Sequence, residues 1–426
     1  MTRLPPPARC GALLAVSLLC LGLANAAETG FDPVAATEAY VARLSPEARA
    51  RSDAYYEGGY WLLLVELGFT LLTSWLLLRT GLARRLRDRA EHWSRRPFAQ
   101  GWLFMTVFCL LMAVLKLPLD FYEGYWREHA YRMSNQTLGS WAGDHLMGGL
   151  VSLVIVPPLL ALLYAGIRRY QARWWIAASV ATPFLLVFFI MLAPVFIAPL
   201  FNTYTTIDEA TVRDPILSLA RANGVPAEHV YQFDASRQTK RVSANVSGAF
   251  GTIRVSLNDN LLNRCPAEGV LAVMGHELGH YVLNHILRHV VYLGLLFAVG
   301  FWFANRFFHF VLARLGAGWG LRGIGDFAGL PLLSAALGVF VFFTTPVRNT
   351  IIRVAEVEAD YYGLNAARQP DAMAEVFLML SEYRKMQPGK WEEFMFFDHP
   401  AGYNRILAAM RWKAEQLGEL PPPLAR

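Results

Sequence analysis

Long hydrophobic runs separated by short polar segments dominate the pattern along this chain. Six of them are long enough, or nearly so, to cross a bilayer as helices, and they lie at about 60–79, 101–118, 146–166, 174–199, 289–305 and 327–346. A shorter apolar run within residues 1–26 follows two arginines and ends at Ala24-Asn25-Ala26, as in a secretory signal peptide. The alternative for this segment is an uncleaved first membrane helix, but its short length favours cleavage after Ala26.

Arginines are concentrated in alternate loops between these runs, in 79–96, 167–173 and 306–325. Because basic residues are retained on the cytoplasmic side, a single topology satisfies all three loops. It places the remaining polar segments together on the opposite side, and these are 27–59, 119–145, 200–288 and 347–426. With such a leader, we expect a multi-pass protein of the bacterial inner membrane whose chemistry faces the periplasm. The lumen of a eukaryotic organelle is the alternative.

Polar sequence between the fourth and fifth runs predicts a small mixed insert. Residues 209–222 alternate like an amphipathic helix, and short β-branched runs follow at 229–233, 241–247 and 253–257. A helix then begins at Pro266, a favoured first helical position, and continues through His285 toward the fifth run. Three further helices are expected in the C-terminal part, at about 348–368, 370–386 and 402–417.

These patterns divide the chain into five parts. They are the leader (or first membrane helix) over 1–26, a membrane domain with four helices over 27–199, an insert over 200–288, two further membrane helices over 289–346 and a C-terminal helical part over 347–426. The predicted fold class is mainly α, a polytopic membrane helical bundle whose insert contains a small β-sheet.

Composition agrees with a membrane protein and excludes several other classes. The chain has 426 residues, of which 55% are hydrophobic and 17% charged, so it is neither disordered nor fibrous. Its net charge of +6 comes mainly from arginines beside the apolar runs, and no nucleic-acid partner is expected. Of the four cysteines, only Cys265 lies in polar sequence. A metal ion would therefore need histidine and carboxylate ligands.

The segment His276-Glu277-Leu278-Gly279-His280 is an H-E-x-x-H motif. On a helix, positions i and i+4 share a face, so the two imidazoles can bind one Zn²⁺. Glu277 points about a third of a turn away, where it can take a proton from the attacking water. The alternative is two ordinary surface histidines. The apolar residues before the motif disfavour this alternative, because they indicate a partly buried helix.

Downstream carboxylates offer the third ligand that a catalytic zinc requires. Glu356 and Asp360 lie i,i+4 on one predicted helix face, so one can ligate zinc while the other orients a ligand histidine. The alternative is a charged face paired with Arg353, which we consider weaker beside a metal motif on the same side of the membrane. A later cluster, His399 with Arg405, could stabilise an oxyanion or hold the substrate backbone.

These motifs, in this order, resemble the integral-membrane zinc metalloproteases of the CAAX prenyl protease type 1 family. The likeness spans about 100–412, and its carriers are Leu271–His280, Glu356–Asp360, and His399-Pro400 with Arg405. Supporting matches are Leu117-Pro118, Asn135–Gly139 and Ile197–Phe201. The resemblance implies a membrane bundle that encloses a water-filled chamber around a zincin-like (gluzincin) insert. Such a chamber would also explain Glu66, which is costly at membrane depth.

The resemblance also implies roles for individual residues. One Zn²⁺ per chain would be held by His276, His280 and Glu356, with Glu277 as the general base. Asp360, with Arg353 nearby, would support the ligands, and His399 and Arg405 would lie near the substrate.

A substrate-pairing strand is implied as well. The family typically has Asn-Ala in this edge strand, whereas this chain has Ser243-Ala244 with Asn245 next to them. We expect an extended peptide to pair along 241–247. A cleaved leader would leave six membrane helices, and an outward-facing site makes prenylated C termini unexpected substrates.

The sequence therefore predicts a membrane-embedded zinc metalloendopeptidase that acts on peptides or membrane-associated proteins, with the lipid bilayer and its substrate as partners. Two other classes stay open. The first is a catalytically inactive membrane chaperone or quality-control protein of the same fold, which an intact Glu277 disfavours. The second is a transporter, which does not account for the ordered set of motifs.

Overall fold

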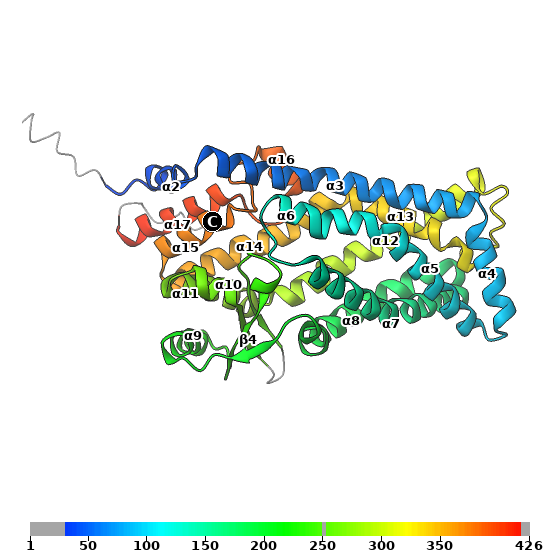
Figure 1. Cartoon of the computed structure of the whole chain (residues 1–426), viewed down its shortest axis with the longest axis horizontal. Coiled ribbons are helices and arrows are strands. Elements are labelled where there is room, and N and C mark those ends of the chain that lie inside the picture. Colours follow the sequence, from blue (N-terminus) through cyan, green and yellow to red (C-terminus); the bar gives the residue numbers. More distant parts are fainter. Residues whose placement is uncertain (1–29, 249–252, 419–426) are drawn as a thin grey trace, which may run out of the picture.

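A computed structural model describes residues 30–248 and 253–418 of the chain (Figure 1). The predicted leader over 1–26 lies outside these residues. Helices dominate the described part, and the small sheet lies beside one end of the helical bundle. The predicted fold class, a mainly α membrane bundle with a small β-sheet, is confirmed.

Four helical segments are long and apolar enough to cross a membrane. They are Pro46–Arg79 (α3), Pro97–Ala130 (α5, Pro97–Phe121, and its continuation), Leu138–Leu200 and His285–Leu315 (α12). The third segment has 63 residues, which is too long for one crossing. A 3₁₀ turn at Gln171–Arg173 divides it into α7 (Leu138–Tyr170) and α8 (Trp174–Leu192). These two helices lie side by side, so they account for two of the crossings that the sequence predicts.

The last expected crossing, at about 327–346, differs from the prediction. Helix α13 (Leu330–Phe343) ends at Thr344, and α14 (Thr345–Ala367) continues after a bend of 53°. Pro346 lies in the first turn of α14, where its missing N–H breaks no helical hydrogen bond. Its ring disfavours helical geometry in the residue before it, which favours a break at this point. Together the two helices are long and apolar enough for one broken membrane span or a re-entrant loop, and α14 packs against α11 of the insert.

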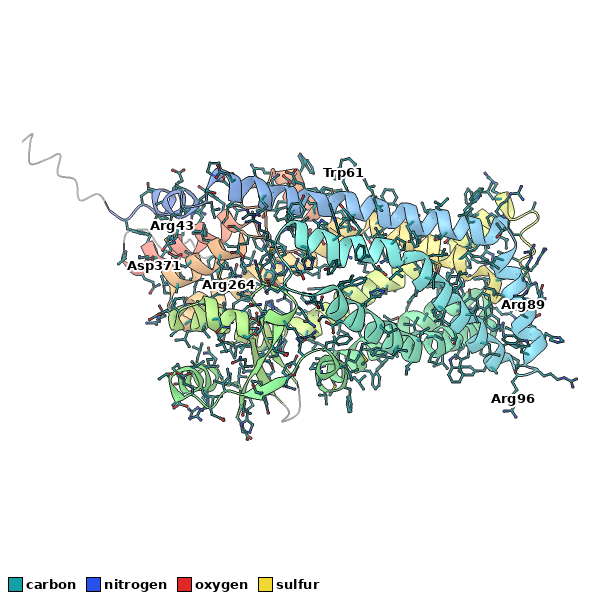
Figure 2. The ribbon with its side chains drawn as sticks, viewed as in Figure 1. Arg43, Trp61, Arg89, Arg96, Arg264 and Asp371 are labelled. Carbon is teal, nitrogen blue, oxygen red and sulfur yellow. The ribbon has the colours of Figure 1, made fainter. Side chains whose placement is uncertain are left out.

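Arginines from the predicted cytoplasmic loops lie at the end of the bundle that is farther from the sheet, where Figure 2 labels two of them. Arg89 and Arg96 lie at one end, where α4 (Leu82–Trp93) crosses the bundle. There Arg87 forms a buried ion pair of 2.5 Å with Asp326, and Arg168 donates to the carbonyl of Gly325 at 2.9 Å. The three loops that the arginine pattern places on one side of the membrane therefore meet at one end of the molecule.

Glu66, which sequence analysis identified as costly at membrane depth, is paired with a lysine. Lys116 Nζ lies 2.8 Å from Glu66 and 3.2 Å from Asp120, which reduces the cost of charge at this depth. Asp120 also lines a polar cavity of about 510 Å³, together with Glu123 and His145. The ion pair of Glu66 with Lys116 is thus linked to this cavity through Asp120.

The insert contains a four-stranded sheet in the order β1-β2-β4-β3. Strands β2 (Val230–Phe233), β3 (Ala244–Ser247) and β4 (Arg254–Asn258) match the predicted runs, whereas β1 (Tyr204–Thr206) was not expected. β2 pairs in parallel with β4, and the outer strands β1 and β3 pair antiparallel with their neighbours. One edge of β3 is therefore not covered by any strand of the described residues.

Helix α9 (Ala210–Ala222), the short helix α10 (Asp259–Arg264) and α11 (Ala267–Val282) complete the insert. Buried Val255 and Leu257 of the sheet belong to one core with Met274 and Leu278 of α11. This core holds α11 against the sheet. Pro266 is the N-cap of α11, so the helix begins one residue later than the sequence predicts. The helix then stops before Asn284, whose φ is 54°, and α12 begins at His285, so the expected uninterrupted helix is broken there.

Glycines allow α11 and α14 to approach each other closely. A Cβ at Gly275 would lie 3.0 Å from the carbonyl oxygen of Gly363, and a Cβ at Gly363 would lie 2.8 Å from the amide nitrogen of His276. Neither position has room for a side chain. The close contact fixes the residues of the two helices that face each other across it.

Four helices form the C-terminal part, and three of them correspond to the predicted ones. They are α14, α15 (Pro370–Leu380), α16 (Lys390–Phe396) and α17 (Gly402–Gln416), of which α16 was not expected. Buried Ile406 and Met410 of α17 join a core with Phe377 of α15. The N-terminal helix α2 (Pro33–Val41) packs against α15 and α17, so both ends of the described chain lie beside the insert (Figure 1).

Candidate metal centre

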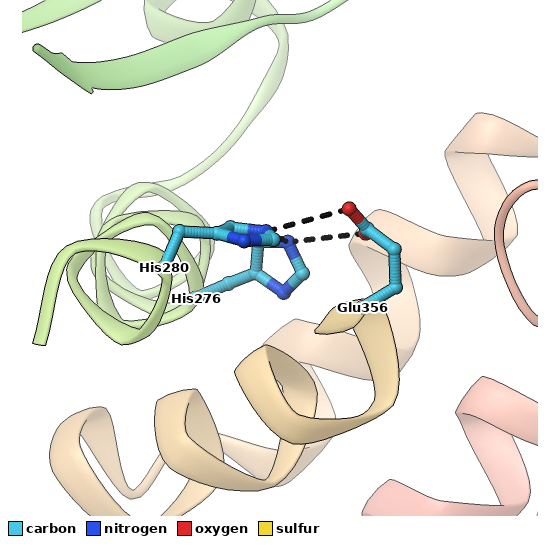
Figure 3. A group of neighbouring side chains, drawn as sticks. All are labelled: His276, His280 and Glu356. Carbon is cyan, nitrogen blue, oxygen red and sulfur yellow. Dashed lines mark hydrogen bonds and ion pairs between the residues drawn. The ribbon is translucent and has the colours of Figure 1, made fainter. Parts of the chain in front are cut away.

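The three predicted metal ligands meet between α11 and α14 (Figure 3). His276 Nε2 and His280 Nε2, one turn apart on α11, lie 3.0 Å from each other. Each of these nitrogens lies 3.4 Å from an oxygen of Glu356 on α14. All three ligand atoms lie within 4.8 Å of one another.

The donor set fits a divalent metal ion. Glu356 Oε2 is buried and makes no hydrogen bond, although His399 Nε2 lies 3.1 Å away. A buried acceptor without a hydrogen bond costs free energy, and a cation between the three ligands would satisfy it. Two imidazoles and one carboxylate also leave a coordination position open, as catalytic metal sites require.

His276 is oriented by a buried carboxylate. Its Nδ1 lies 2.9 Å from Asp360 Oδ1, which leaves Nε2 directed at the metal position. The guanidinium of Arg405 donates to both oxygens of Asp360, at 2.7 and 2.6 Å. Sequence analysis placed Arg405 near the substrate, and Arg405 lines the cavity beside the metal ligands; contact with a substrate stays a prediction. Its Nη2 also lies 3.9 Å from Glu356 Oε2, but both of its hydrogen bonds go to Asp360, the carboxylate that supports His276.

His280 is oriented through a residue that sequence analysis assigned no role. His280 Nδ1 lies 2.9 Å from His285 Nδ1, and His285 Nε2 lies 3.0 Å from Glu358 Oε2. Arg288 forms an ion pair with Glu358. If His285 donates from Nε2 to the carboxylate, its Nδ1 accepts from the Nδ1–H of His280. The Nε2 lone pair of His280 then remains available for a metal ion.

The motif spacing does not reveal this second arrangement. His285 lies five residues after His280, which would place it on another face of a continuous helix. The break at Asn284 turns it back toward the site. Glu358, two residues after Glu356, was visible in the sequence, but its partner was not.

Burial dominates the pKa of Glu277, whereas hydrogen bonds dominate that of His276. Burial raises the pKa of the Glu277 carboxyl, more than the neighbouring His276 and His280 lower it. For His276, burial lowers the pKa, but hydrogen bonds with Asp360 and Glu356 outweigh it and raise the pKa to about 10. A carboxyl with a raised pKa suits a group that accepts a proton during the reaction.

His399 lies next to the ligands. Its Nε2 is 3.1 Å from Glu356 Oε2, and its Nδ1 lies 2.8 Å from Asp398 Oδ1. Burial lowers the pKa of His399 more than its bond with Asp398 raises it. Arg353 donates to the carbonyls of Glu393 and Phe397, at 2.9 and 2.5 Å. It thus fixes the segment that carries His399 and makes no hydrogen bond to a metal ligand.

A cavity of about 220 Å³ adjoins the metal ligands and reaches the edge of β3. Ser243 and Ala244 line it, whereas Asn245 does not. The amide of Asn258 donates to the carbonyl of Ser243 at 2.9 Å. In an antiparallel ladder the next residue directs its peptide groups the other way, so Ala244 presents its amide and carbonyl along the uncovered edge.

A multi-pass helical bundle with a His-His-Glu metal site and an adjoining cavity defines a membrane metalloprotease. Residues 34–203 match the family model described as CAAX prenyl protease N-terminal, five membrane helices, and residues 206–413 match that of peptidase family M48. The chain therefore belongs to the M48 metallopeptidases, in the branch of the CAAX prenyl proteases.

Individual relatives agree with this assignment. An uncharacterized metalloprotease YhfN of Bacillus subtilis is 28% identical over 365 residues, which cover 85% of each chain. A CAAX prenyl protease 1 homolog of Oryza sativa is 24% identical over 72% of each chain. The crystal structure of Ste24p from S. mikatae shares the fold, with a TM-score of 0.73 and 20% identity over 86% of this chain and 89% of that one.

Proposed function

We propose that this membrane metalloprotease is a zinc-dependent endopeptidase whose site opens on the side opposite the arginine-rich loops. One observation carries the proposal: two imidazole nitrogens and a carboxylate oxygen from two helices lie within 4.8 Å of one another. Two histidines and a glutamate with an open position are typical ligands of catalytic zinc. In this topology the catalytic side of a bacterial inner-membrane protein would face the periplasm.

Zinc, when bound, would supply a Lewis acid that polarises the scissile carbonyl and makes water more acidic. Glu277 accepts the proton of the attacking water and passes it to the leaving amine, so that the peptide bond breaks without a covalent intermediate. His399, once protonated on both ring nitrogens and with its Nδ1–H on Asp398, would donate from Nε2 toward the oxygen of the scissile carbonyl as negative charge develops there. Asp360 and Arg405 keep His276 in position.

The substrate would bind as an extended strand along β3. Ala244 presents unpaired peptide groups beside the cavity, and Ser243 lines its wall. Such pairing binds backbone and tolerates many side chains. Asn245 would contact the peptide only outside the cavity. The rice relative is named for CAAX prenyl substrates. For this chain we propose peptides or membrane-associated proteins more generally, because the arginine pattern places the cavity away from the cytoplasm.

The Glu277→Gln variant tests this function. We expect purified Glu277→Gln protein to keep its zinc and to lose cleavage of an unstructured peptide by about a hundredfold or more, the usual contribution of a general base. Glu268→Gln is the matched control, because Glu268 lies on the same helix, is exposed and does not line the cavity. Equal cleavage by Glu277→Gln and wild type would contradict the mechanism.

A further inference from the structure

Arg384 is an unpaired cation in the wall of the catalytic cavity. It lies between α15 and α16 and lines the same cavity as His276 and Glu277. Its Nη1 is buried and has no hydrogen-bond partner, and its guanidinium forms no ion pair with the described residues. Its backbone is fixed, since its carbonyl accepts a hydrogen bond from Ser52 Oγ at 3.2 Å.

The other arginines around the site are satisfied. Arg405 donates twice to Asp360, and Arg353 donates to two backbone carbonyls. Arg241, just before β3, lies 2.9 Å from a carboxylate oxygen of Glu128. Arg384 differs from all three. A buried donor without a partner costs free energy, and a ligand in the cavity that accepts a hydrogen bond from Nη1 would offset this cost.

The acidic residues near Arg384 are already engaged. Asp398 bonds His399 at 2.8 Å and does not reach Arg384 within ion-pair distance. Glu356 belongs to the metal ligands, and Glu277 acts on water in the proposed mechanism. These carboxylates therefore leave Arg384 available to a group that enters the cavity.

The surroundings of Arg384 favour an anion. Phe377, Leu380 and Tyr383 form the neighbouring wall of the cavity. In such apolar surroundings an ion pair is stronger than in water. A guanidinium matches the two oxygens of a carboxylate in geometry as well as in charge.

We propose that Arg384 binds a carboxylate of the peptide substrate and gives the enzyme a preference for peptides that carry one close to the scissile bond. The inference rests on the proposed peptidase function. Two sources share this chemistry: the C-terminal carboxylate of a peptide that is cut near its end, and an Asp or Glu side chain.

Paired peptides separate the two sources. One pair differs only in a C-terminal acid or amide, and the other contains Glu or Gln at one internal position near the cleaved bond. We expect wild type to prefer the carboxylate member of one pair by about tenfold or more in kcat/KM, the usual range for a charge-assisted hydrogen bond. The pair that shows the preference identifies the source.

Variants of Arg384 show whether this residue causes the preference. Arg384→Gln should bring the ratio of the two kcat/KM values within that pair close to one. It should leave cleavage of the neutral peptide within about threefold of wild type. Arg384→Lys keeps the charge without the two-pronged geometry and should retain part of the preference. Arg264→Gln is the control, because Arg264 pairs with Glu382 outside the cavity. Ratios for both pairs that are the same in wild type and in Arg384→Gln would overturn the proposal.

Binding to a protein without turnover distinguishes this inference from the proposed function. In a Glu277→Gln background, a fluorescent carboxylate peptide should bind about tenfold more weakly after Arg384→Gln, while its neutral counterpart binds equally. That result without cleavage by wild type would uphold the carboxylate site and reject the peptidase function. Cleavage by wild type, together with equal binding of the carboxylate peptide before and after Arg384→Gln, would uphold the peptidase function and reject the carboxylate site.

Discussion

The two ligand histidines lie one turn apart on α11, yet their outer nitrogens are held in different ways. His276 contacts the Asp360 carboxylate directly, whereas His280 contacts a neutral ring, His285, and reaches Glu358 only through it. The side chain of Asp360 is 5% exposed and that of Glu358 37%. One ligand is thus supported by a buried ionic pair, and the other by a relay that ends near solvent.

The two supports also connect α11 to different parts of the molecule. The Asp360–Arg405 pair joins the metal site to α17, far along the chain. His285 is the first residue of α12, a membrane-spanning helix. A buried charge that loses its partner is much more costly than a solvated one. Asp360, which contacts its ligand directly, should therefore contribute to both the stability of the fold and the affinity for the metal, whereas Glu358 should contribute little to either.

The largest effect is expected from Asp360→Asn. The change leaves the buried Arg405 cation without the carboxylate to which it is hydrogen-bonded, with only Glu356 at 3.9 Å as an anionic neighbour, which should lower the free energy of unfolding by about 3–5 kcal/mol. Zinc affinity should fall by about ten- to hundredfold, because His276 loses its orienting anion. Thermal unfolding and competition with a chelator measure the two quantities.

A double variant isolates the pair from its surroundings. Asp360→Asn combined with Arg405→Met should be more stable than Asp360→Asn alone, because no unpaired charge remains. If the losses in the free energy of unfolding caused by Asp360→Asn and by Arg405→Met simply added in the double variant, the two residues would not be a buried ion pair.

A smaller effect is expected from His285→Ala. Without an acceptor for its Nδ1–H, His280 loses its fixed tautomer, so zinc affinity should fall by about tenfold. The unfolding transition should shift less than in Asp360→Asn, since no ion is left unpaired in the interior. His285→Asn supplies an amide oxygen as an acceptor and should recover part of the affinity. Unchanged chelator competition in His285→Ala would show that the relay does not support the metal.

Zinc binding should depend on pH through His276. Because its pKa without metal is raised to about 10, the ring is protonated below that pH and must lose a proton to bind zinc. Apparent affinity should therefore rise with pH, by about tenfold per unit for this one proton, between about pH 6.5 and 8.5. The Asp360→Asn variant should show a flatter dependence, because the bond with Asp360 helps to raise this pKa. An affinity independent of pH in wild type would contradict the proposed protonation.

The smallest effect belongs to Glu358→Gln. Its side chain and that of Arg288 are both 37% exposed, so water replaces much of what the pair contributes. We expect zinc affinity to change by at most about fivefold, and less at high salt. A loss as large as that of Asp360→Asn would mean that the two supports are equivalent after all.

The sequence predicted the residues whose spacing carries the chemistry. His276, His280 and Glu356 were identified because one helical turn and a second carboxylate motif place donors on two facing surfaces. The membrane helices and three of the four strands followed from apolar runs and β-branched segments. These features depend on local pattern.

Tertiary contacts determined what the sequence did not reveal. The break before His285 and the 53° bend after α13 arise where a helix meets its neighbours. β1 has three residues and forms by pairing with β2. The hydrogen bonds between Arg405 and Asp360 were missed, because the two residues lie 45 positions apart in the chain. Arg384 carried no motif, and only its position in the cavity wall drew attention to it.

The most direct test of the metal site is the zinc content of the detergent-purified full-length protein, wild type beside Glu356→Gln. The variant keeps the size of the side chain and loses its charge. The account predicts about one zinc per wild-type chain and a large loss of zinc in Glu356→Gln, with both proteins folded by their thermal unfolding. A folded wild-type protein that holds no zinc after incubation with it, or a variant that holds as much as wild type, would contradict the site.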